Sequence, residues 1–61
     1  MYIILTLKDS GDLINVNMSM AFTFQASGNG YTDIDFGNDF VVRVAESTST
    51  IRSMIKAAQR N

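Results

Sequence analysis

The clearest structural signal in the sequence is the stretch MSMAFTFQA, residues 18–26. Its larger apolar side chains alternate with small or polar ones, and the alternating set consists of Met18, Met20, Phe22, Phe24 and Ala26. A period of two that is sustained over such a length is typical of a half-buried β-strand. The alternative to one continuous strand is a strand that is broken by a bend near residues 18–20. This stretch predicts a sheet protein whose Met and Phe side chains form either its core or an interface.

Shorter strands are predicted on both sides of this stretch. Residues 2–7 are rich in β-branched and aliphatic side chains, and a turn with Asp, Ser and Gly separates them from a second short apolar segment at residues 13–17. A loop with two glycines at residues 27–30 leads into further strands at residues 31–36 and 40–44. Because side chains alternate along a strand, we expect one set on one face of each strand. These sets are Ile3, Leu5 and Leu7, then Ile14 and Val16, and then Thr32, Ile34 and Phe36.

The pattern changes to a helical one after Ala45. Ser47 is a suitable N-cap, and an apolar stripe with helical spacing follows it, formed by Ile51, Met54, Ile55 and Ala58. We therefore expect a helix from about residue 48 to residue 60 that lays this stripe on the sheet. The predicted fold is α+β: an antiparallel β-meander of four to five strands over residues 1–45, followed by one C-terminal amphipathic helix over residues 47–60. Residues 1–61 form a single small domain.

The composition argues against catalysis. The 61 residues include neither Cys nor His, so disulfides, thiolate ligands and imidazole chemistry are excluded. Asp33 and Asp35 share a strand face, but that face is expected to be solvated. The acidic run at residues 33–39 departs from a calcium loop, because its Gly stands at the fifth position and Val44 occupies the twelfth. We predict a protein that is not an enzyme and that uses no metal or cofactor.

The N-terminal apolar run lacks the features of a targeting signal. No positive region precedes it, and no small-residue cleavage site follows it before Lys8 and Asp9. No segment reaches the roughly 20 apolar residues of a membrane span. We therefore expect a cytoplasmic protein without a membrane span.

Charge is distributed unevenly along the chain. Residues 1–46 carry two basic and six acidic side chains, a local charge of −4, whereas residues 47–61 carry three basic side chains and no acid. The candidate contacts for an anion or a nucleic acid are Arg43, Arg52, Lys56 and Arg60. Three interpretations stay open at this stage: a solvated helix face, a nucleotide-like anion held between subunits, and a weak nucleic-acid interface.

Apolar surface exceeds what one helix can cover. A domain of this size buries only about 60% of the surface of its unfolded chain, and a single helical stripe is too narrow for the faces of five strands. The side chains that we expect in the core or at an interface are Met18, Met20, Phe22, Phe24 and Phe40. Exposed apolar patches and open strand edges favour association. The sequence therefore predicts a homo-oligomer, a symmetric dimer or a small ring, that also binds a protein partner.

The order of these elements resembles the small flagellar accessory family called FlbD in some bacteria and SwrD in others. The matching segments are Val16–Asn17, Ile34–Gly37 and Val42–Ser47, together with Ile51 and Ile55 in the helix. The Thr-Ser-Thr run at residues 48–50 and the Met and Phe side chains of residues 18–24 depart from the family pattern. The resemblance implies a partner-binding accessory protein of the motor and implies no catalytic residues.

Overall fold

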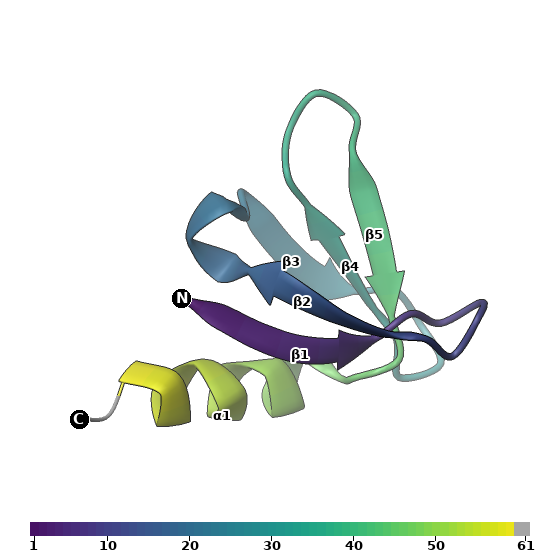
Figure 1. Ribbon diagram of the computed structural model, residues 1–61. Helices are drawn as coiled ribbons and strands as arrows, with labels where there is room; N and C mark the ends of the chain where they lie inside the picture. Colours follow the sequence, from purple (N-terminus) through teal and green to yellow (C-terminus); the bar gives the residue numbers. More distant parts are fainter. Residues whose placement is uncertain (60–61) are drawn as a thin grey trace.

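Five strands and one C-terminal helix make up the computed structural model, which describes residues 1–59 (Figure 1). The strands are β1 (Tyr2–Thr6), β2 (Leu13–Asn17), β3 (Thr23–Ala26), β4 (Thr32–Asp35) and β5 (Val41–Val44), and the helix is α1 (Thr48–Gln59). A short 3-10 helix, η1 (Met18–Met20), separates β2 from β3. The predicted α+β class is confirmed.

The antiparallel strands form two sheets that meet at one corner. β1 pairs with β2 in a hairpin, and β3, β4 and β5 form a consecutive three-stranded meander. The sheets join where β1 ends, because the Ala45 amide donates to the Thr6 carbonyl at 2.8 Å and the Lys8 amide donates to the Arg43 carbonyl at 3.1 Å. Figure 1 shows the hairpin crossing in front of the three-stranded sheet, with α1 beneath it. β2 and β3 are therefore left at the edges of their sheets.

The predicted strand over residues 18–26 is broken in the way that the bend alternative described. The Asn17 side chain accepts a hydrogen bond from the Ser19 amide at 3.1 Å, and this cap starts the 3-10 turn. Only residues 23–26 remain as a strand. Expecting all of its Met and Phe side chains on one face was therefore wrong: Met18 and Phe24 pack on the core, whereas Met20 is 68% exposed and Phe22 is 80% exposed.

The core lies between the two sheets and the helix. Its fully or nearly buried apolar side chains are Ile3, Leu5, Val16, Ile34, Val44 and Ile51. The shared strand faces predicted along β1, β2 and β4 are confirmed, and the structure shows that they point inward, Ile14, Phe36 and Leu7 being half-buried. Of the predicted helical stripe, Ile51 is fully buried and Met54 and Ile55 are half-buried, but Ala58 is exposed. The helix closes one side of the core and leaves much of the strands uncovered.

Polar contacts fix the start of the helix against both sheets. The Ser47 hydroxyl accepts from the Thr50 amide at 3.2 Å, which confirms Ser47 as the N-cap. The Glu46 carboxylate accepts from the Thr6 amide and from the Thr6 hydroxyl, both at 2.9 Å. The buried Thr32 hydroxyl donates to the Glu46 carbonyl at 2.7 Å. Glu46 thus ties β1 and β4 to the helix, and the predicted helix end at residue 60 lies outside the described residues.

Candidate interaction groove

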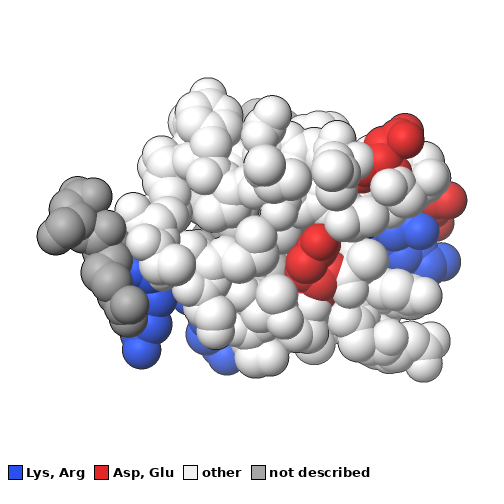
Figure 2. Space-filling view, turned by 60° about the horizontal axis from the view of Figure 1, so that its bottom comes forward, with Lys and Arg blue, Asp and Glu red and all other residues white. Residues whose placement is uncertain are grey.

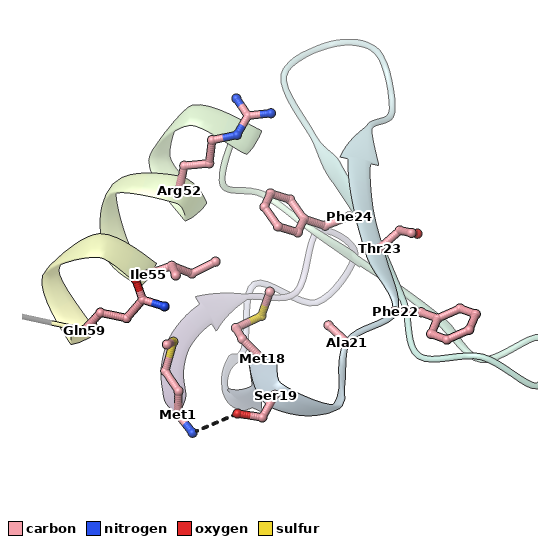
Figure 3. A pocket seen from close by; sticks show the side chains of 10 residues that line it. All are labelled: Met1, Met18, Ser19, Ala21, Phe22, Thr23, Phe24, Arg52, Ile55 and Gln59. Atoms are coloured by element: carbon pink, nitrogen blue, oxygen red, sulfur yellow. Dashed lines mark hydrogen bonds between the residues drawn. The ribbon is translucent and has the colours of Figure 1, made fainter.

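A groove of about 520 Å³ runs between α1 on one side and η1 and β3 on the other (Figure 3). Residues from all three elements line this groove. The residues that line it are Met1, Met18, Ser19, Ala21, Phe22, Thr23, Phe24, Arg52, Ile55 and Gln59. We call this feature the α1–β3 groove.

The inner part of the α1–β3 groove is apolar. Phe24 from β3 and Ile55 from α1 point toward the space between these elements, and Met18 and Ala21 lie below them (Figure 3). All of these side chains are half-buried and pack against the core. Phe22 lies on the rim and points away from the groove. The groove therefore offers apolar contacts that are backed by the folded core.

Polar groups stand at the two ends of the α1–β3 groove. At one end the N-terminal ammonium donates to the Ser19 hydroxyl at 3.3 Å, and Gln59 lies nearby in Figure 3. Arg52 stands at the other end. Its guanidinium makes no ion pair with any residue of the described chain, and the helix carries no acid of its own. A groove with an apolar floor and a cation at its mouth suits a ligand that combines an apolar group with a carboxylate.

The predicted basic contacts are not gathered in one place. Arg43 lies on β5, where its Nε donates to Asp33 Oδ1 at 2.8 Å and its Nη2 donates to Asp33 Oδ2 at 3.2 Å. Arg52 and Lys56 lie on α1 and line a second, smaller hollow of about 340 Å³. Figure 2 shows Lys and Arg side chains at two well-separated places on the surface. A site containing Arg43, Arg52 and Lys56 therefore requires more than one chain. Arg60 lies outside the described residues.

The two acidic side chains on β4 have different partners, and Asp33 pairs with Arg43. The hydrogen bond from Arg43, with a contribution from Ser27, lowers the pKa of Asp33 below its ordinary value, and Asp33 raises the pKa of Arg43 in return. Asp35 has a different task, because its Oδ1 accepts from the Gly37 amide at 2.8 Å within the turn after β4. Both carboxylates are half-buried rather than freely solvated. Asp33 therefore links β4 to β5, and Asp35 stabilises the turn that follows β4.

Phe40 lies apart from the other candidate interface residues. It belongs to the turn between β4 and β5, where its ring lies 5.5 Å from that of Phe36 between centroids, and it is largely exposed. It does not line the α1–β3 groove. The five side chains that the sequence grouped together thus divide into groove residues (Met18 and Phe24), rim or exposed residues (Met20 and Phe22) and this turn residue.

Sequence reasoning missed several groups at the groove. Met1 and Gln59 line it but belong to no pattern in the sequence, and Ala21 is one of the small or polar side chains that alternate with the Met and Phe set. Their position at the groove follows from the placement of α1 and η1 on its opposite sides, which only the folded chain shows. Within residues 1–59, no three acidic side chains gather to hold a metal ion.

Comparison of the chain with protein-family models, curated proteins and solved structures found no match. The resemblance to the flagellar accessory family therefore stays a prediction. No helix within residues 1–59 combines the length and the apolar character that crossing a membrane would need.

Proposed function

We propose that this protein is a small, non-enzymatic, homo-oligomeric module that binds a protein partner. The observation that carries the proposal is the amount of large apolar surface left outside the core. Seven such side chains are more than half exposed: Tyr2, Ile4, Leu13, Met20, Phe22, Phe40 and Val41. Three of them, Tyr2, Ile4 and Leu13, lie together on the exposed face of the β1–β2 hairpin, and a contiguous exposed apolar patch is typical of a protein interface.

The α1–β3 groove is the proposed site for the partner. Its floor is apolar, and Arg52 at its mouth is not engaged by an acid of the described chain. Charge complementarity therefore favours a partner segment that places an aromatic or aliphatic side chain between Phe24 and Ile55 and an adjacent carboxylate on Arg52. The turn of a partner protein or an extended segment can present this combination.

Peptide selection tests this site. A displayed random-peptide library is selected on the wild-type protein, and the enriched peptides are remeasured against Arg52→Glu and Lys56→Glu. Lys56 is the matched control, because it is a cation on the same helix that does not line the groove. We expect enriched peptides to carry an apolar side chain beside Asp or Glu. Arg52→Glu should weaken them at least about tenfold, in line with the roughly 1.5–3 kcal/mol of a charge-assisted hydrogen bond.

Two results count against the proposed site. One is the enrichment of peptides without an acid, and the other is equal binding of the enriched peptides to wild type and Arg52→Glu. Equal weakening by Arg52→Glu and Lys56→Glu would show that only the overall charge of the helix matters.

The alternatives of a nucleotide-like anion and of a nucleic acid stay predictions. Arg52 and Lys56, one helical turn apart, are the described residues that both would use. Absorbance at 260 nm in excess of that of the protein, on the purified protein peak, would favour them. A gel-shift affinity that is unchanged when both cations are neutralised would exclude the nucleic-acid interface.

A further inference from the structure

Within residues 1–59, strand β2 has one edge without a strand partner. β1 is its neighbour in the two-stranded sheet, and η1 turns the chain away before β3 begins. The Leu7 amide donates to the Asp12 carbonyl at 2.8 Å, and the Met18 amide donates to the Met1 carbonyl at 2.9 Å. Because antiparallel pairs alternate, the even-numbered residues of β2 bond to β1. The backbone N–H and C=O groups of Leu13, Asn15 and Asn17 therefore point to the open edge.

This edge lacks the features that keep strands apart. The segment LINVN, residues 13–17, contains no charged residue and no Pro, and its pairing with β1 is regular without a bulge. Natural edge strands are commonly protected by such features. An unprotected edge in a folded protein is a template for another strand.

The exposed face of the same hairpin is also free of charge. It presents Tyr2, Ile4 and Leu13, all largely exposed, together with Thr6, Asn15 and Asn17. A two-fold axis places the residues that lie on it opposite their own copies, so charged side chains close to the axis would repel one another. The charge-free edge and face are compatible with a second copy of this chain, and this argues for that occupant over an acidic or basic partner.

We propose that two copies pair through β2 across a two-fold axis at Asn15, which gives a four-stranded sheet in the order β1-β2-β2-β1. This inference rests on the self-association in the proposed function and names its interface. In this register Asn15 faces Asn15 of the second copy, and Leu13 faces Asn17. Three residues on each chain then exchange backbone hydrogen bonds, about six in all.

The same register extends the core. On the inner face of β2, Ile14 is half-buried and Val16 is buried. Pairing about Asn15 places Ile14 beside Val16 of the second copy, which covers the part of Ile14 that is exposed in one chain. Moving the pairing by two residues would leave backbone groups of the edge unpaired, so the arrangement about Asn15 satisfies the edge best.

Cysteine cross-linking tests this register, since the chain has no cysteine of its own. Directly opposed residues of a hydrogen-bonded antiparallel pair have Cα atoms about 5.5 Å apart, which lies within the range for disulfides. Asn15→Cys should therefore give a disulfide-linked dimer on mild oxidation, reversed by reductant. Leu13→Cys is the matched control on the same strand and face, because the register holds its two copies four residues apart, about 13 Å along the strand. It should not cross-link above the level of random collision.

A non-covalent test uses two lysine variants. Asn15→Lys puts like charges on the axis and should raise the dimer dissociation constant at least about tenfold, whereas Gln25→Lys on the edge strand β3 should leave it unchanged. Circular dichroism checks that both variants are folded. The β2 interface is overturned if Leu13→Cys links as readily as Asn15→Cys. It is also overturned if the wild type is oligomeric but Asn15→Cys does not link, in which case the proposed oligomer stands without this interface. A wild type that is monomeric overturns both.

Discussion

Replacement of Ile51 with Ala tests how the helix is attached to the sheets. Ile51 is the fully buried side chain of α1, and it lies in the core with Leu5, Ile34 and Val44. Truncation of a buried Ile to Ala costs about 2–5 kcal/mol. A chain of 61 residues has a total stability of roughly 3–9 kcal/mol, from about 0.05–0.15 kcal/mol per residue. The variant should therefore be severely destabilised or unfolded at room temperature.

Phe22→Ala is the contrasting variant. The sequence pattern places Phe22 among the side chains expected in the core or at an interface, and in the structure its ring is 80% exposed on the rim of the groove. Surface truncation away from special features changes stability by about 0.5 kcal/mol or less. In thermal unfolding, by contrast, Ile51→Ala should lower the melting temperature by about 12–24 °C, which corresponds to a loss of about 3 kcal/mol in the free energy of unfolding for a domain of this size.

Thermal unfolding followed by circular dichroism at several protein concentrations measures both variants. Dilution separates the effect on assembly from the effect on folding. A fall in melting temperature that arises from a weaker oligomer changes with protein concentration. A concentration-independent loss of stability for Phe22→Ala that equals the loss for Ile51→Ala would contradict the placement of Phe22 outside the core. It would mean that residues 18–22 continue β3 as a strand with Phe22 facing the core.

Substitutions at three further positions test local features of the fold. Thr32→Val keeps the side-chain shape but removes the donor to the Glu46 carbonyl, and we expect urea denaturation to show a loss of about 1–3 kcal/mol. Arg43→Gln should raise the pKa of Asp33 toward its ordinary value, as followed by carboxyl NMR. Because the folded pKa of Asp33 is lowered, the pair stabilises the wild type above the unfolded pKa, and this contribution is lost as the pH falls through the folded pKa. The variant should lack that acid-dependent part, and an unchanged Asp33 titration would contradict the pair. Gly37→Ala should cost about 1–2 kcal/mol from backbone strain alone, since φ is 86° and no heavy atom lies within 4 Å of the added Cβ. Gly37→Asn should cost less, because Asn tolerates this backbone region, and equal costs would argue against strain as the cause.

The parts of the fold that were predictable from the sequence depend on short-range periodicity. Ile3 and Leu5 share an inward face because strand side chains alternate, and Ile51 was found from its place in a helical stripe. The Ser47 cap was predictable for the same reason, since its partner Thr50 lies three residues away. Local rules were sufficient wherever the decisive contact was local.

The 3-10 turn at residues 18–20 shows where periodicity was not sufficient. The alternation continues through these residues, but the Asn17 side chain caps the Ser19 amide and turns the chain. This cap competes with strand pairing beyond the end of β4, where the β3–β4 ladder stops at the pair Thr23–Asp35. As a result Phe22 lies outside the core although its place in the pattern is equivalent to that of Phe24.

Contacts between distant segments decided the rest of the candidate site. Arg43 meets Asp33 because the register of β4 and β5 places them opposite each other, and a shift of the hairpin by one residue would put them on different faces. The α1–β3 groove likewise depends on where the helix settles. Neither the register nor the helix position is encoded in the spacing of the residues themselves, so the sequence grouped cations that the fold keeps apart.

The claim that this protein self-associates underlies both proposals, and its molar mass in solution is the direct measurement of it. Light scattering behind size exclusion at micromolar to millimolar concentrations should give a multiple of 6.7 kDa, and twice that mass if β2 pairs with β2. The mass should fall toward that of one chain on dilution. A mass of 6.7 kDa across the whole concentration range would contradict the claim and would leave the exposed apolar surface to a different protein partner.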